Sequence, residues 1–144
     1  MDFFTSMEVS ASGLAVERTR MNVASSNLAN AQTTRTPQGG PYQRQNVIVR
    51  SGDAPAVAGG EAGGFANAVK SVEVAAIQAD GAAPRMEYDP GHPDADANGY
   101  VAYPNVNVIE EMVDMITASR AYEAGVTALN TSVSLAERAL SIGR

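Results

Sequence analysis

The sequence predicts a mainly α-helical protein whose N- and C-terminal helices pair as an α-helical coiled coil, with a small irregular β-containing middle segment. Two observations carry this prediction: apolar residues recur in heptad spacing at both ends, and a Gly/Pro-rich stretch separates them. The 144 residues divide accordingly into an N-terminal helical segment (1–35), a β/loop middle (36–104) and a C-terminal helical segment (105–144).

The N-terminal helix has apolar residues in two rows, each repeating every seven positions. The rows are Met7, Leu14, Met21 and Leu28, and Val9, Val16 and Val23. Each residue advances a helix by about 100°, so rows about 200° apart cannot face one partner. We therefore expect neighbours on more than one side of this helix. Its last turn is expected near residues 29–30, where polar residues replace the pattern.

The middle segment is expected to form a small, loosely packed β element of three strands. The β-branched run Val47-Ile48-Val49 predicts a strand over 42–50, and weaker patterns predict strands over 69–77 and 85–88. The Gly/Ala/Pro-rich residues 52–66 predict a flexible loop. The Pro/Gly/Asp-rich residues 89–105 predict an extended loop before the second helix.

The C-terminal helix carries a longer apolar seam, with Asn107 as its predicted N-cap and Glu110 placed as in a capping box. The seam consists of Val108, Met112, Met115, Ser119, Tyr122, Val126, Leu129, Val133, Ala136 and Leu140. These steps of four and three span roughly five heptads, which is typical of a coiled coil. Gly125 costs such a helix about 1 kcal/mol relative to alanine. We interpret it as a close crossing with another helix.

Composition excludes several classes of protein. The formal net charge is −6 with no basic patch, which argues against a nucleic-acid partner. There is no cysteine for disulfide or thiolate chemistry, and no run approaches the ~20 apolar residues of a membrane span. The first residues lack a basic and then apolar signal pattern, which predicts either a cytoplasmic protein or export without a cleaved signal peptide. Aromatic residues make up only 6%, so we expect much of the burial to come with assembly.

The loop over 89–98 supplies the alternative hypothesis, a Ca²⁺-binding protein or a carboxylate-dependent enzyme. Asp94-x-Asp96-x-Asn98-Gly99 matches the opening of an EF-hand calcium loop, but the twelfth position is Asn105 rather than Glu. His92, the single histidine, supplies one ligand or base where zinc needs three or four ligands. We therefore expect an Asp/Gly loop whose side chains cap its own backbone.

Other chemical motifs are weak. No G-x-S-x-G elbow accompanies the serines, and the glycine pairs at 59–60 and 63–64 lack the Lys and Ser/Thr of a phosphate loop. Glu110, Glu111 and Asp114 form a cluster of carboxylates, but acidic residues at a helix start are favoured by the macrodipole. We predict no catalytic, cofactor-binding or metal-binding residues, no cofactor and no small-molecule substrate.

Several longer motifs resemble those of bacterial flagellar proteins. Ser10-Ala-Ser-Gly-Leu14, Arg18-Thr-Arg-Met-Asn22 and Ser26-Asn-Leu-Ala-Asn30 look like the N-terminal signature of the rod and hook axial family. The segment YDPGHPDADANGY over 88–100 is more discriminating and is similar to proximal-rod members. The segments 101–108, 111–115 and 118–124 extend that likeness.

The resemblance implies a structural subunit of the basal-body proximal rod, not an enzyme. Such proteins polymerise through their terminal helices into the tubular drive shaft that transmits torque. The implied partners are copies of the chain, other rod proteins, adjacent basal-body base components and the flagellar type III export apparatus. The implied location is the rod in the periplasmic space, reached from the cytoplasm without a cleaved signal peptide.

Two sets of residues are expected to serve this function. The predicted subunit-packing residues are Met7, Leu14, Met21, Asn27, Leu28, Asn30, Met112, Met115, Tyr122, Gly125, Val126, Leu129, Val133 and Leu140. The predicted bracing loop, which would support the helix pair or a neighbouring subunit, contains Asp89, Pro90, His92, Pro93, Asp94, Asn98 and Tyr100.

Overall fold

The computed structural model describes residues 3–53 and 70–142. Its elements are α1 (Phe3–Ala29), β1 (Gln45–Asp53), β2 (Lys70–Ala79), β3 (Arg85–Tyr88), β4 (Tyr100–Tyr103) and α2 (Val108–Ile142). The predicted fold class is confirmed: two long terminal helices enclose a small β-containing middle. The expected loop over 52–66 lies outside the described residues except for Gly52 and Asp53, which belong to β1.

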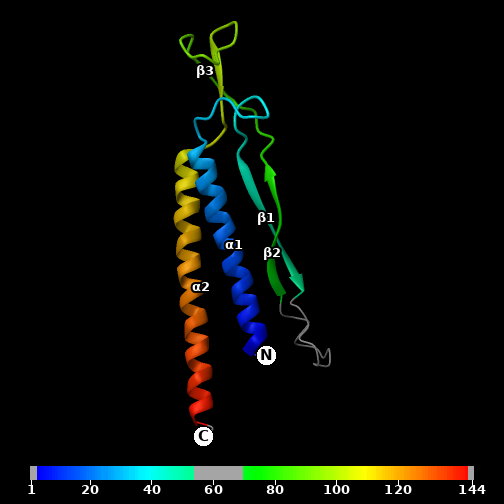
Figure 1. The fold of residues 1–144 in the computed structure, drawn as a ribbon, viewed down its shortest axis with the longest axis vertical. Coiled ribbons are helices and arrows are strands. Elements are labelled where there is room, and N and C mark those ends of the chain that lie inside the picture. Colours follow the sequence, from blue (N-terminus) through cyan, green and yellow to red (C-terminus); the bar gives the residue numbers. More distant parts are fainter. Residues whose placement is uncertain (1–2, 54–69, 143–144) are drawn as a thin grey trace.

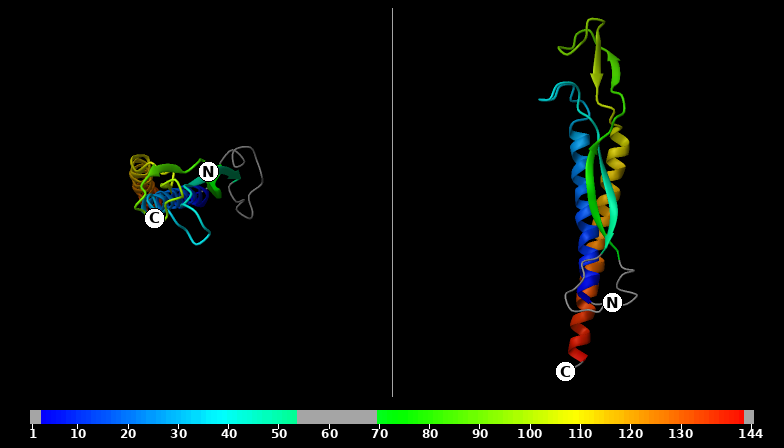
Figure 2. Two further views of the ribbon diagram at one scale, coloured as in Figure 1. Left: turned by 90° about the horizontal axis from the view of Figure 1, so that it is seen from above. Right: turned by 90° about the vertical axis from the view of Figure 1, so that its right-hand side faces the viewer.

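The two helices run antiparallel and lie side by side, as both views in Figures 1 and 2 show. Asn27 near the end of α1 bonds Glu111 near the start of α2, and Leu14 lies against Gly125 further along. Because α2 has 35 residues and α1 only 27, the end of α2 extends past the start of α1.

Helix α1 has neighbours on two sides, α2 on one and the β1–β2 hairpin on the other (Figure 1). Leu14 of the first apolar row contacts α2, while Val16 and Val23 of the second row are buried. On the hairpin side, the backbone N–H of Val72 donates to Ser12 Oγ at 3.2 Å. The two rows on this helix therefore correspond to two packing partners.

The strands form two separate antiparallel hairpins, so the expected element of three strands is wrong. Strand β1 pairs with β2, with a register shift between Ile48 and Val49. Strand β3 pairs with β4, from Arg85 opposite Tyr103 to Tyr88 opposite Tyr100. The expected loop over 89–105 thus contains β4. That strand has only four residues before Pro104, too few for a pattern to stand out, and its pairing with β3 forms across the intervening loop.

The element ends follow local chemistry. Helix α1 ends at Ala29 as predicted, and Asn107 caps α2 by accepting a hydrogen bond from Ile109 N at 3.1 Å. Strand β1 starts at Gln45 rather than 42, because residues 42–44 cross the helix ends. Strand β2 covers Lys70–Ala79, against the expected 69–77.

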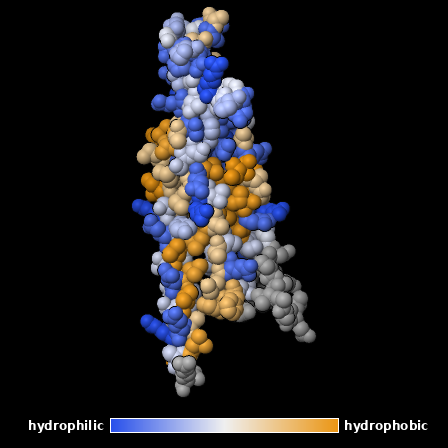
Figure 3. All heavy atoms as spheres, viewed as in Figure 1, coloured by the Kyte–Doolittle hydropathy of each residue, from blue (hydrophilic) through white to orange (hydrophobic). Residues whose placement is uncertain are grey.

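The apolar core is thin. Among the residues that the structure describes, the buried apolar ones are Val16, Val23, Ala24, Ala31, Val101, Pro104 and Ala118. All are small or medium-sized, so the isolated chain gains little from burying large side chains. Figure 3 shows apolar side chains on the surface along the helices and the β1–β2 hairpin, whereas the β3–β4 tip is largely polar.

Candidate assembly surfaces and the buried polar junction

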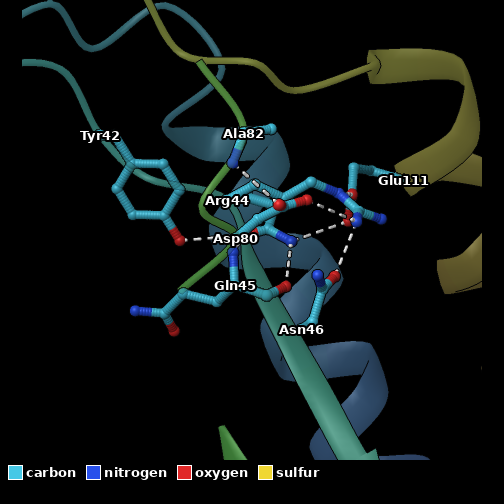
Figure 4. A network of polar contacts seen from close by, with 8 residues as sticks. Tyr42, Arg44, Gln45, Asn46, Asp80, Ala82 and Glu111 are labelled. Atoms are coloured by element: carbon cyan, nitrogen blue, oxygen red, sulfur yellow. Dashed lines mark hydrogen bonds and ion pairs between the residues drawn. The ribbon is translucent and has the colours of Figure 1, made fainter. Parts of the chain in front are cut away.

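A buried polar junction joins α1, α2 and the start of β1 (Figure 4). Its centre is the pair Asn27 and Glu111, which are 1% and 2% exposed. Asn27 Nδ2 donates to Glu111 Oε2 at 3.0 Å and to the carbonyl of Gln45 at 2.9 Å. Asn27 Oδ1 accepts from Tyr42 Oη and from Gln45 N, both at 2.9 Å. The amide of Asn27 therefore uses its full hydrogen-bonding capacity within the chain.

Arg44 completes the junction from the segment before β1. Its Nε donates to Glu111 Oε1 at 2.6 Å, and Nη1 donates to Asn46 Oδ1 at 2.6 Å and lies 3.8 Å from Asp80 Oδ2. Burial of the guanidinium opposes its charge, but the hydrogen bond and charge of Glu111, with Asp80 and Asp114, raise the pKa of Arg44 above its ordinary value. The guanidinium of Arg44 is therefore held in its charged form and is paired with Glu111.

Sequence reasoning missed most of this junction. It explained Glu111 by the helix macrodipole, and it placed Tyr42 and Arg44 in a strand. Glu110 is exposed as that reading expects, but Glu111 is buried against Asn27. One feature of the sequence pointed to the burial of Glu111. It lies seven residues before Ala118 and fourteen before Gly125, so it is a charged residue in a heptad row of small residues.

From Met115 on, every second position of the predicted α2 seam is partly buried as expected. The positions between them are displaced by one residue towards the start of the helix. Met115, Tyr122, Leu129 and Ala136 are partly buried, as the seam requires. The intervening inward positions are Glu111, Ala118, Gly125 and Ser132. Val108, Met112 and Leu140 are 42%, 45% and 76% exposed, so they do not lie in the contact between α1 and α2. The packing of Met112 and Leu140 between subunits remains a prediction. At Gly125 the two helices approach closely, since a Cβ there would lie 2.7 Å from Leu14 Cδ2.

The remaining predicted packing residues on the two helices are partly buried, as Leu14 and Met115 are. They are Met7, Met21, Leu28, Val126 and Val133. Asn30 is used locally: its Nδ2 donates to Ser26 O, and its Oδ1 accepts from Thr33 Oγ1. A role for any of these residues between subunits remains a prediction.

Residues 108–116 at the start of α2 carry an apolar face that is largely exposed in the described chain. Val108, Ile109, Met112, Val113 and Ile116 are between 42% and 73% exposed. We call this set the α2 apolar face. Only Val108 and Met112 were in the predicted seam. Beside this face runs a groove of about 600 Å³ between the helices, lined by Met21, Met115 and Ile116 among others.

The loop between β3 and β4 is built mainly on its own backbone. Asp96 Oδ1 accepts from the backbone N–H groups of Asn98 and Tyr100, and Asp89 Oδ1 accepts from Gly91 N. Gly99 has φ +84°, and a Cβ there would lie 2.9 Å from a ring carbon of Tyr88. These Asx turns and the glycine fix the shape of the loop without an ion.

One side chain of the predicted bracing loop reaches another element. Asp94 accepts from Thr34 Oγ1 at 2.8 Å and lies 3.6 Å from Arg35 Nη1, in the segment that follows α1. The other contacts of the set stay within the β3–β4 hairpin and its loop. His92 Nδ1 accepts from Asp94 N, the His92 ring packs edge-on against Tyr103, and Tyr100 packs edge-on against Tyr88. Pro90 lies beside Gly99, while Pro93 and Asn98 are exposed.

The alternative hypothesis of a calcium or carboxylate site finds no support in this geometry. Within residues 3–53 and 70–142, no three His, Asp or Glu side chains gather where they could hold a metal ion. The oxygens of Asp94 and Asp96 instead bond Thr34 and the loop backbone. In the same part of the chain, no helix is long and apolar enough to cross a membrane.

Comparison with known proteins accounts for both helices. Residues 7–35 match the family described as "Flagella basal body rod protein", and residues 97–142 match "Flagellar basal body rod FlgEFG protein C-terminal". The first match covers most of α1, and the second covers β4 and α2. The segments that pack together in the structure are therefore the ones that match the rod families.

Relatives of nearly the same length match over the whole chain. The flagellar basal-body rod protein FlgC of Borreliella burgdorferi is 45% identical, with 99% of this chain and 98% of the relative covered. FlgC of Bacillus subtilis is 43% identical over the full length of both. FlgC of Salmonella typhimurium is 40% identical over 95% of each. The chain therefore belongs to the FlgC family of flagellar basal-body rod proteins.

Proposed function

We propose that this chain polymerises through the outer faces of α1 and α2 into the tubular, torque-transmitting shaft of the proximal rod. Family membership makes it a structural rod subunit and not an enzyme. The observation that carries the mode of assembly is the α2 apolar face, whose five side chains are 42–73% exposed. Such a contiguous apolar surface on a helix is typical of a protein–protein contact.

The surfaces of the chain suggest how its contacts are divided. The thin core supports assembly as the main source of burial, since the large apolar side chains of α2 remain outside the helix pair. We assign copies of the chain and other rod proteins to the helical faces, and adjacent basal-body base components to the exposed helix ends. The polar β3–β4 tip is assigned to the outside of the helical layer.

Export is a second part of the proposal. The subunit would leave the cytoplasm unfolded through the flagellar type III export apparatus, without a cleaved signal peptide, and assemble in the periplasmic space. A thin core of small residues is compatible with unfolding for passage, and the absence of cysteine prevents disulfides that would obstruct it.

Two added carboxylates on the α2 apolar face test the assembly surface. Ile109→Asp with Val113→Asp would bury two charges in any helical contact, which costs several kcal/mol. We expect a folded monomer by circular dichroism but no rod assembly and no motility in cells lacking the native protein. The matched control adds the same charge at exposed alanines outside the helices, Ala82→Asp with Ala97→Asp. Normal assembly of the helix variant would refute the assigned surface.

A further inference from the structure

We propose that the buried Asn27–Glu111 pair sets the register of the α1–α2 pair, a task that the apolar packing of the two helices does not perform. The pair joins the end of α1 to the start of α2 and is the one fully buried polar contact between the two helices among the described residues. In coiled coils, a buried polar pair fixes register in the same way, because any other register leaves its members without partners.

The packing surface of α2 repeats itself every seven residues. Small side chains stand at Ala118, Gly125, Ser132 and Ala139, and the larger Met115, Tyr122 and Leu129 stand between them. A shift of seven residues, about 10 Å along the helix, replaces each small residue by a small one. Tyr122 takes the place of Met115 and Leu129 takes the place of Tyr122, whereas the small Ala136 takes the place of Leu129.

The facing row of α1 has the same period. Met7, Leu14, Met21 and Leu28 recur every seven residues, and Leu14 lies against Gly125. After a one-heptad shift, Leu14 would face Ser132 and Met21 would face Gly125. By the same spacing, each large residue of this α1 row would meet a small residue of α2 in the shifted register. The contact at Gly125 favours the native register only weakly, because the atom that approaches it is the flexible end of a leucine side chain.

Nor does helix overlap distinguish the two registers. In the native register α1 faces α2 up to about residue 136, which leaves Leu140 and Ile142 76% and 85% exposed. The shifted register would bring that last part of α2 against the start of α1 and cover some of this apolar surface. Apolar burial is therefore available in both registers.

The polar junction separates the two registers. In the shifted pair, Asn27 would face Ala118, and Glu111 would lie beyond the end of α1. The amide of Asn27 would lose its carboxylate partner, and Arg44, which contacts both Glu111 and Asp80, would be drawn away from one of them. Burying a polar group without its partner lowers the stability of the fold. Replacing both members of a buried pair by apolar residues often leaves that stability unchanged.

Disulfide trapping measures the register directly, because the chain has no cysteine. Leu14→Cys with Gly125→Cys reports the native register, and Leu14→Cys with Ser132→Cys reports the shifted one. Each cysteine pair is introduced into the full-length chain, which is oxidised at low concentration. The quantity measured is the yield of the 14–132 disulfide divided by the yield of the 14–125 disulfide. In Asn27→Leu with Glu111→Leu we expect this ratio to rise at least about tenfold, the effect of about 1.4 kcal/mol.

Two further variants complete the test. Asn22→Leu with Glu110→Leu makes the same substitutions at exposed positions of the same helices and should leave the ratio unchanged. Glu111→Ala with Ala118→Glu moves the carboxylate by one heptad and should make the shifted disulfide the major one. An unchanged ratio in both junction variants would overturn the proposal. Loss of helical circular dichroism in the Asn27→Leu, Glu111→Leu variant would also overturn it, since the pair would then be needed for folding rather than for register.

Discussion

Leu14 of α1 lies against Gly125 of α2 so closely that a Cβ on residue 125 would be 2.7 Å from Leu14 Cδ2. A glycine within a 35-residue helix is unfavourable by itself, so the close approach of the two helices accounts for its presence. Large residues of the predicted seam such as Met112 are exposed, and the neighbouring Glu111 is buried in the helix pair instead.

Substitutions at Gly125 should separate helix propensity from packing. Gly125→Ala should change stability by less than about 1 kcal/mol, because the gain in propensity offsets a contact with a flexible side-chain end. Gly125→Val should destabilise by about 1–3 kcal/mol through overpacking. Urea unfolding measures both, and Leu14→Ala should relieve part of the cost of Gly125→Val. Gly13→Ala, where a Cβ would meet nothing within 4 Å, is the control and should stabilise the chain.

The sequence predicted the two helices well and the middle segment poorly, for physical reasons. A helix of 27 or 35 residues repeats its pattern many times, so Leu14, Met115 and Leu129 could be placed from spacing alone. Strand β4 offers only four residues and depends on long-range pairing. Heptad spacing also does not show which neighbouring row faces inwards.

The polar junction was beyond sequence reasoning because its members are far apart in the chain. Asn27 and Glu111 are separated by 84 positions, and Arg44 comes from a third segment. Each residue alone has an ordinary explanation, as a helix-end amide, a first-turn carboxylate and an exposed strand residue. Their burial together in the structure shows that the main contacts of the Glu111 carboxylate are with Asn27 and Arg44, not with the helix macrodipole.

Removing Asn27 should be among the most damaging single changes in the chain. Asn27→Ala leaves Glu111 Oε2, the carbonyl of Gln45 and its N–H without their present partner. We expect a loss of about 2–5 kcal/mol in the free energy of unfolding. Asn22→Ala, at an exposed position on the same helix, should cost less than about 0.5 kcal/mol. Equal losses for the two variants in urea unfolding would contradict the role of the junction.

The contribution of Arg44 to stability should not depend on pH in the neutral and mildly alkaline range. Its pKa is raised in the folded state, so its stabilisation is fully present below the ordinary arginine pKa and declines only as pH rises through the higher folded value. The destabilisation by Arg44→Met should therefore be the same at pH 7 and pH 9. A loss that differed between these two pH values by more than about 1 kcal/mol would show that another titrating group dominates.

The link between the β3–β4 loop and the segment after α1 should contribute little to monomer stability. Asp94 is 26% exposed and Arg35 80% exposed at their ion pair, and solvent screens such contacts. We expect Asp94→Asn to cost less than about 1 kcal/mol in unfolding. If the loop braces a neighbouring subunit, this variant should nevertheless reduce rod assembly. Glu87→Gln, which removes one charge from an exposed ion pair with Arg85 outside the loop, is the matched control.

The free end of α2 should change most between monomer and rod. The end of α2 extends past the start of α1 (Figure 1), and residues 137–142 are exposed, with Leu140 and Ile142 at 76% and 85%. A helix end without tertiary contacts frays, so its amide hydrogens should exchange rapidly in the dilute chain, while residues 111–125 exchange more slowly. Hydrogen-exchange mass spectrometry of monomer and assembled rods measures both segments. Burial of the free end against neighbouring subunits should slow its exchange in the rod. Strong protection of 137–142 in dilute monomer would mean that assembly is not what stabilises this end of the helix.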